Sequence, residues 1–285
     1  MCKVTVVIPC YNQGGYIKAT VASVQEQVFL DWEIIIVNDG SDDNETNKIL
    51  ADLVIPKVKI IHTENKGVSA ARNVGIANAK GTFILPLDAD DIIGKEYLKE
   101  AVAIMDVDAK LKVVYCNGEY FGDESGAIEL PDYDSKKMLL QNLIFCTALY
   151  RKDDWFDCGG YDEHFLTGWE DWDFWLRFIQ NESQVYKLPG VHFHYRIKKE
   201  SRNAGLIHEK LKRTEQQLYK KHFELYRKHY PQPITLIREY EYLMQERTNY
   251  EKYKDELHRS LSYRTGNFIL HPLKWLAAIG RSAKK

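Results

Sequence analysis

Residues 4–12 read VTVVIPCYN, an apolar and largely β-branched run that ends in a turn. Similar apolar runs return at Glu33–Val37, Val58–Ile61 and Thr82–Leu87. Such runs are typical of strands that helices cover on both faces. Segments with helical spacing lie between the runs, at residues 16–27, 43–53 and 67–80. The alternation predicts a mostly parallel α/β sheet with a binding site at the carboxyl ends of its strands.

The chain beyond residue 90 is less regular. The pattern predicts strands at Lys112–Cys116, Thr147–Tyr150, Gln184–Leu188 and His192–Arg196, a hairpin or flexible loop at Glu119–Leu130, and a helix at Glu170–Gln180. After Ser201 the composition shifts to Lys, Glu, Leu and Tyr, and Pro231 and Pro233 separate two long helical segments. We therefore expect a catalytic domain at residues 1–202, divided near residue 92, and a helical extension at 203–285.

Two patterns in the extension suggest contacts with a partner or a surface. Residues spaced alternately by four and three form a heptad seam: Leu236, Tyr240, Leu243, Arg247, Tyr250, Lys254, Leu257 and Leu261. This seam either packs on its own domain or joins two copies into a homodimer. Residues 263–285 mix apolar and basic side chains, so they either pack on the protein or lie on a membrane surface.

Composition excludes several classes of protein. The 285 residues are 45% hydrophobic and 28% charged, a soluble globular balance, and the formal net charge of −2 does not favour nucleic acid as a partner. The 5 cysteines are scattered and never spaced as CxxC, which argues against disulfides and zinc. Val4–Ile8 is too short for a signal peptide. These features predict a cytoplasmic protein.

The run at Thr82–Leu87 ends in the acidic sequence DADD at residues 88–91. Carboxylates crowded after a buried strand repel one another unless a cation lies among them. Mg²⁺ and Mn²⁺ prefer oxygen ligands, and one such ion can bind protein carboxylates and substrate phosphates at the same time. The sequence therefore favours a metal site over a solvated acidic loop.

Two more charged positions are expected at the same edge of the sheet. Asp39 follows the second strand, where it can accept hydrogen bonds from a ribose or a base, while Ser41 or Asp42 can cap the next helix. Arg72 falls in the first turns of a helix that starts at this edge. Its guanidinium can pair with a donor phosphate or hold one of the aspartates in an internal ion pair.

The stretch from Gly168 to Trp175, GWEDWDFW, places acids among tryptophans at the start of a helix. Aromatic faces stack on sugar rings, and apolar walls raise a carboxyl pKa toward the range of a general base. The alternative is a buried aromatic helix whose acids complement the helix dipole.

With these motifs in order, the sequence resembles the family 2 glycosyltransferases of the GT-A fold. The resemblance runs from about residue 3 to 202 and rests on VVIPCYN, VNDGSDD, NKGVSAARNVGI, LDADD and GWEDWDFWLR. It implies a Rossmann-like, mostly parallel sheet flanked by helices. Residues 1–92 would bind the nucleotide-sugar and 93–202 the acceptor. Residues 262–273 are similar to tails of bacterial polysaccharide enzymes of this family.

The resemblance also implies an inverting enzyme that uses Mn²⁺ or Mg²⁺ and a nucleotide-sugar donor, with UDP as the expected nucleotide. The residues that would bind the donor are Pro9, Tyr11, Asn12, Asp39, Asn65, Gly67, Arg72, Asp88, Ala89 and Asp90. Asp171 would be the general base, with Glu170 beside it, and the acceptor would be a glycan or lipid-linked hydroxyl.

The metal ligands implied by the resemblance are Asp90, Asp88 and a histidine. Many relatives carry this histidine just after a Tyr-Arg pair, but here Tyr195-Arg196 is followed by Ile197-Lys198-Lys199. His192 and His194 come earlier, and His194 is the predicted ligand.

Two other functions compete with a glycosyltransferase. A sugar-1-phosphate nucleotidyltransferase has a similar sheet but needs a basic, Gly-rich loop after its first strand, and Pro9–Tyr16 has no basic residue. The same stretch also lacks GxGxxG, which argues against a nicotinamide or flavin enzyme. A non-catalytic scaffold that uses the C-terminal helices does not explain the uncompensated acid clusters.

Overall fold

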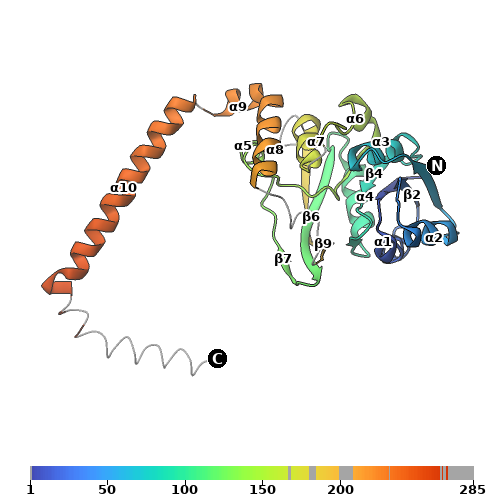
Figure 1. Cartoon of the computed structure of the whole chain (residues 1–285), viewed down its shortest axis with the longest axis horizontal. Helices are drawn as coiled ribbons and strands as arrows, with labels where there is room; N and C mark the ends of the chain where they lie inside the picture. Colours follow the sequence, from blue (N-terminus) through green and yellow to red (C-terminus); the bar gives the residue numbers. More distant parts are fainter. Residues whose placement is uncertain are drawn as a thin grey trace. The chain divides into compact units, whose positions relative to one another are not determined.

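The computed structural model describes residues 2–165, 168–179, 184–198, 208–230, 232–263, 265 and 268. The chain divides into two units, residues 1–226 and 227–285. The first unit is an α/β domain in which helices flank one continuous sheet (Figure 1). The second contains α10 (Pro233–Arg259).

The first ninety residues alternate strand and helix, as the sequence predicts. The strands are β1 (Val4–Cys10), β2 (Trp32–Asp39), β3 (Val58–Thr63) and β4 (Phe83–Pro86). The helices between them are α1 (Gly14–Gln25), α2 (Asn44–Asp52) and α3 (Val68–Ala77). The four strands pair in parallel in the order β3-β2-β1-β4, which confirms the predicted parallel sheet.

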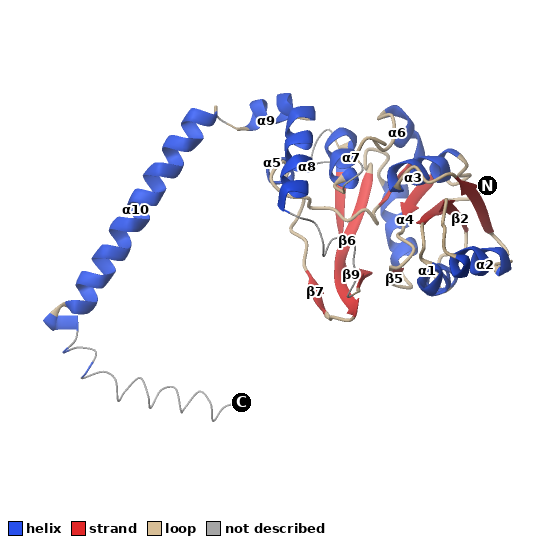
Figure 2. Cartoon of the chain, viewed as in Figure 1, coloured by secondary structure: helices blue, strands red, loops and turns tan. Residues whose placement is uncertain are grey.

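Apolar side chains on both faces of the sheet explain why these runs are almost continuously hydrophobic. On one face, Val6 and Ile34 pack with α1, α2 and α4 (Tyr97–Val107). On the other face, Val7 and Ile35 pack with α3 and α7 (Glu170–Phe178). The two layers of helices shown in Figure 2 therefore bury opposite faces of the same strands.

The second half of the sheet contains both antiparallel and parallel pairs, and the strand next to β4 is antiparallel to it. Its elements are β5 (Ile92–Ile93), β6 (Val113–Gly122), β7 (Gly126–Ile128), α5 (Ser135–Met138), β8 (Leu149–Arg151), α6 (Lys152–Asp157) and β9 (Val185–Ile197). The order continues from β4 through β8, β6 and β9 to β5, and β7 pairs with β6. The β6–β7 pairing confirms the hairpin alternative for Glu119–Leu130.

The two short strands predicted at the end of the domain are one strand, β9, so that prediction was wrong. Pro189 and Gly190 suggested a break, because both residues weaken a strand. In the structure β9 pairs with β6 on both sides of them, and the register shifts between Cys116 and Gly118 on β6 absorb the irregularity. Because β9 is long, Arg196 near its end reaches Asp90 and Asp91, the acids that follow β4.

The helical segment predicted after residue 204 is two helices, α8 (His208–Lys221) and α9 (Phe223–His229). The predicted break between the helical segments is confirmed, because α9 ends at His229 and α10 begins at Pro233, a position where the missing N–H of proline is not needed. Every residue of α10 is exposed. Among the described residues, no helix is long and apolar enough to cross a membrane. The surface helix predicted at the C-terminus falls almost entirely on residues outside those described.

Candidate active site

A cavity of about 570 Å³ opens at the carboxyl ends of β1, β2 and β4. All the predicted donor-binding residues line it: Pro9, Tyr11, Asn12, Asp39, Asn65, Gly67, Arg72, Asp88, Ala89 and Asp90. The loops that follow parallel strands meet at this edge, which is why residues far apart in the sequence gather there. Tyr195, Arg196 and Lys198 at the end of β9 complete the wall.

Arg72 is buried and joins two parts of the site. Its Nη2 donates to Asp88 Oδ1 at 2.8 Å, and its Nη1 donates to Glu170 Oε1 at 2.9 Å. Asp88 lies just beyond β4, and Glu170 starts α7. The internal ion pair, one of the two alternatives for Arg72, is thus present. The bridge fixes the start of α7 against the acidic end of β4.

Asp90 is paired with a cation that directly follows β9. Lys198 Nζ lies 2.5 Å from Asp90 Oδ2, and Arg196 Nε donates to the Asp90 carbonyl at 2.7 Å. The backbone N–H of Arg196 donates to Asp91 Oδ1 at 2.8 Å. Burial, together with the charges of Asp88 and Asp90, raises the pKa of Asp91 well above its usual value.

The acidic cluster fits a metal only in part. In the described part of the chain, no group of three or more His, Cys, Asp or Glu side chains is arranged to hold one. The ring of His194 lies 2.7 Å from Glu119 Oε1, and His194 is not among the residues that line the cavity. Mg²⁺ is often held by one or two carboxylates plus substrate phosphates. Asp90 is a carboxylate of this kind on the cavity wall, and in this structure Lys198 is paired with it.

Asp39 organises the loop before α3. Its two carboxylate oxygens accept hydrogen bonds from the N–H groups of Lys66 and Gly67, both at 2.9 Å. Gly67 has φ of 91°, a left-handed conformation that glycine adopts without strain. Asp39 thereby shapes the wall of the cavity, and its contact with a ribose or base stays a prediction.

Asn12 ties the loops after β1 and β2 together. Its Nδ2 donates to Asp42 Oδ1 at 2.6 Å, and its N–H donates to Ser41 Oγ at 3.0 Å. Ser41 and Asp42 therefore do not cap α2, and that expectation was wrong. Asp43 is the cap, because its Oδ1 accepts from Thr46 N–H at 2.6 Å.

Asp171 has the environment of a base that works near neutral pH. It is half-buried in the first turn of α7, where its Oδ2 accepts from Asn142 Nδ2 at 3.0 Å. Burial and the adjacent charge of Glu170 raise its pKa to about 7. In the described structure neither acid lines the cavity itself, but Arg72 links Glu170 directly to Asp88 on the cavity wall.

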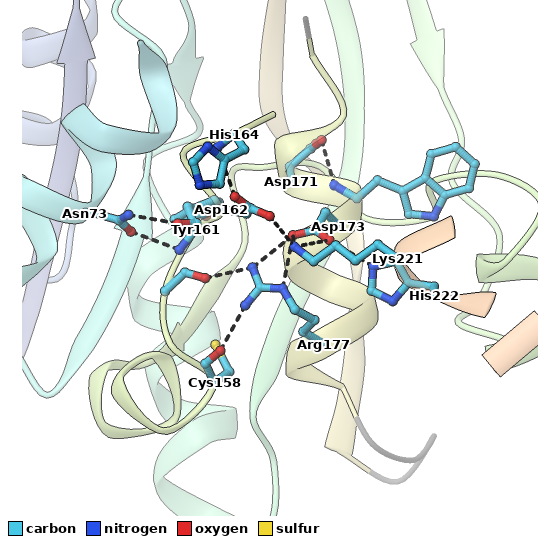
Figure 3. A network of polar contacts seen from close by, with 12 residues as sticks. Asn73, Cys158, Tyr161, Asp162, His164, Asp171, Asp173, Arg177, Lys221 and His222 are labelled. Atoms are coloured by element: carbon cyan, nitrogen blue, oxygen red, sulfur yellow. Dashed lines mark hydrogen bonds and ion pairs between the residues drawn. The ribbon is translucent and has the colours of Figure 1, made fainter. Parts of the chain in front are cut away.

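A second polar network, centred on Asp173, holds the side of α7 opposite Asp171 in place (Figure 3). Asp173 is fully buried and pairs with Arg177 at 3.0 Å, Lys221 at 2.9 Å and His222 at 2.8 Å. Arg177 also donates to the carbonyls of Cys158 and Gly160. The network connects α7 to the end of α8 and to the loop after α6, which fixes the helix that carries Asp171.

Sequence reasoning missed three residues that contact acids of the site, Arg196, Lys198 and Asn142. Arg196 belongs to the Tyr195-Arg196 pair and Lys198 lies just after it, so the pair was the available signal for both. Asn142 had no signal, because a single asparagine in an irregular segment does not indicate contact with a helix far along the chain.

Three comparisons with known proteins agree with this geometry. The family model described as "Glycosyl transferase family 2" matches residues 5–168. An uncharacterized glycosyltransferase of Rickettsia prowazekii is 30% identical over 211 residues, which cover 70% of this chain and 63% of that protein. Glycosyltransferase GlyG of Streptococcus pneumoniae is 33% identical over 50% of this chain and 48% of its own length. The chain spans less than two thirds of these relatives.

Among solved structures, S. aureus TarS 1–349 in complex with UDP-GlcNAc is similar, with a TM-score of 0.61 and 23% identity. The match covers 72% of this chain and 61% of that one. At this identity the likeness shows the fold, and it confirms the predicted GT-A architecture. Because the family model covers more than half of the sequence and its motifs meet at one cavity, the chain belongs to glycosyl transferase family 2.

Proposed function

We propose that the protein is an inverting, metal-dependent glycosyltransferase. It moves a sugar from a nucleotide diphosphate sugar to a hydroxyl of a glycan or lipid-linked acceptor. The observation that carries this proposal is the arrangement of α7. Arg72 ties its first residue to the wall of the cavity, and the next residue, Asp171, has a pKa of about 7. UDP is the proposed nucleotide, supported by the UDP-GlcNAc and UDP complexes of TarS.

In this mechanism Asp171 takes the proton of the acceptor hydroxyl as that oxygen attacks the anomeric carbon. The bond between the anomeric carbon and the diphosphate oxygen breaks on the opposite face, so the configuration inverts. Asp90, with Asp88, would hold a divalent cation, which supplies charge neutralisation to the leaving diphosphate when bound. Arg72 keeps Asp88 and Glu170 in place, and Asp39 keeps the loop with Gly67 in place.

The first experiment is a donor screen. The purified protein is mixed with common UDP-, GDP- and dTDP-sugars, with Mn²⁺ or with chelator, and release and binding of nucleotide are measured. We expect Mn²⁺-dependent release of UDP from one donor. Absence of nucleotide binding under every condition would overturn the proposal. Once an acceptor is found, NMR of the product's anomeric centre tests inversion, and retention of configuration would contradict a single displacement by way of Asp171.

The C-terminal part carries two further proposals. The apolar residues of α10, including Leu236, Leu243 and Leu257, are all exposed, and their heptad spacing suits a homodimer. Sedimentation of the full chain should show a dimer, and the Leu243→Asp variant should be a monomer. Peripheral membrane contact through residues 263–285 is tested by flotation with liposomes. Equal flotation of full-length and truncated chains would exclude it.

A further inference from the structure

A lysine occupies the carboxylate that is proposed to bind the metal. Lys198 Nζ contacts Asp90 Oδ2 at 2.5 Å, and both side chains line the donor cavity. The ammonium also donates to Gln13 Oε1 at 3.2 Å and lies 4.9 Å from the centre of the Tyr16 ring. Lys198 is thus held by contacts from α1 and from the end of β4, and it is not a freely moving surface lysine.

The pair is shielded from water on most sides. The side chains of Lys198 and Asp90 are only 19% and 21% exposed. A charge pair in such a place is stronger than one at the surface, because the effective dielectric constant is lower. Arg196 places a second cation here and anchors Asp90 and Asp91 through its Nε and its N–H. If Lys198 moves away, the Asp90 carboxylate is left without a cation, so this movement is favourable when another cation takes its place.

A divalent cation and the Lys198 ammonium cannot share this contact. Lys198 Nζ lies at Asp90 Oδ2, and a metal bound to the same carboxylate would place two positive charges close together, where they repel each other strongly. A metal that arrives alone must displace the ammonium without giving it a new partner. A metal that arrives with a diphosphate brings such a partner, because phosphate oxygens accept charge-assisted hydrogen bonds from lysine.

We propose that Lys198 is a positioning residue that makes metal binding depend on the nucleotide. In the free site it neutralises Asp90 and weakens the binding of a metal that comes alone. When the donor binds, Lys198 moves from Asp90 to the diphosphate and leaves the carboxylate to the metal. This inference rests on the proposed function, since it requires a nucleotide diphosphate and a metal at Asp90.

The test measures binding rather than turnover. Free Mn²⁺ is titrated by EPR with the full chain, first alone and then with saturating UDP. The affinity for UDP is measured by calorimetry with chelator and with Mn²⁺. The Lys198→Met variant removes the cation, and Lys198→Arg retains it. The control is Lys48→Met, which removes the same charge from an exposed position on α2.

We expect Lys198→Met to bind Mn²⁺ alone about tenfold more tightly than the wild type and to bind UDP in chelator about tenfold more weakly. UDP should raise the Mn²⁺ affinity of the wild type, and this coupling should shrink about tenfold in the variant, because Mn²⁺ no longer has an ammonium to displace from Asp90. Lys198→Arg should retain the wild-type coupling, and Lys48→Met should match the wild type in every titration. A loss of structure alone would weaken both ligands together, which is the opposite pattern for Mn²⁺.

Two failures can be told apart. Normal UDP binding, with equal Mn²⁺ affinities in wild type and Lys198→Met, overturns this inference and leaves the proposed function standing. If the wild type binds no nucleotide with or without Mn²⁺, the proposed function fails and the inference fails with it.

Discussion

The pKa values of the two aspartates on opposite sides of helix α7 are shifted in opposite directions. Asp171 faces an amide and an adjacent acid, and burial raises its pKa to about 7. Burial also opposes the charge of Asp173, but hydrogen bonds from His222 and Lys221 and the charge of Arg177 outweigh it, so its pKa lies below the usual value. Two carboxylates in one turn of helix thus differ in chemistry because their partners differ. One side is suited to proton transfer and the other fixes the helix.

The largest expected effect comes from the reactive side. Asp171→Asn removes the base and keeps the shape, so we expect kcat for transfer to fall about a thousandfold. Stability should not fall. The pKa of Asp171 is raised in the folded state, so its charged form opposes folding as the pH rises through about 7. Steady-state kinetics and urea unfolding at pH 8 measure both quantities.

Asp153→Asn is the matched control for this change, because Asp153 is exposed on α6. It should leave turnover and stability unchanged. Near wild-type turnover in Asp171→Asn would show that another group is the base and would remove the contrast between the two sides of α7.

The second effect concerns the bridge that joins α7 to the cavity. Arg72→Met leaves the buried Glu170 without its cation, and we expect a loss of about 3 kcal/mol in the free energy of unfolding. Asp88 adds little to this figure, because its side chain is 39% exposed. Arg72→Lys keeps the charge but cannot reach both acids, so it should recover part of the stability. Unfolding in urea measures the series, and an unchanged midpoint in Arg72→Met would contradict the role of the bridge.

Most of the fold and many residues of the site could be predicted from patterns of neighbouring residues in the sequence. The parallel strands and the acids at their ends were predictable, because apolar runs and strand-end carboxylates are contiguous in the sequence. The contacts that set the chemistry are not contiguous. Arg196 and Asp90 are 106 positions apart, and Asn142 meets Asp171 across 29 positions. The Tyr195-Arg196 pair marks Arg196 as a candidate site residue, but a single sequence does not show which acid it contacts.

The local errors have local causes. Pro189 and Gly190 resemble a turn, but pairing along β6 overrides their weak strand preference. Ser41 and Asp42 are good capping residues by type, yet both are engaged by Asn12, and the cap moves to Asp43. In each case tertiary contacts decided between two structures that the local sequence allowed.

The third prediction concerns the clamping side of α7. Asp173→Asn removes the charge that holds His222, Lys221 and Arg177, and we expect about 2 kcal/mol of destabilisation at pH 7. Because the pKa of Asp173 is lowered in the folded state, its contribution is present above the ordinary value near 3.8 and is lost as the pH falls below it. The difference between variant and wild type should therefore shrink toward pH 3, as measured by thermal unfolding. A difference that did not change with pH would assign the effect to packing.

The smallest expected effect comes from Asn142, because its substitution changes only one partner of Asp171. Asn142 donates to Asp171 Oδ2 and so favours the ionised form. Asn142→Ala should raise the pKa of Asp171 by about half a unit. For a general base, kcat/KM falls as the pH drops below that pKa, so the acid limb should move from about 7 to higher pH by the same amount. Above the limb the variant should approach wild-type rates, since the base is intact once ionised. A uniform loss of rate with an unmoved limb would instead show that Asn142 places the acceptor. In that case the raised pKa of Asp171 would come from burial and nearby charges such as Glu170, without a contribution from Asn142.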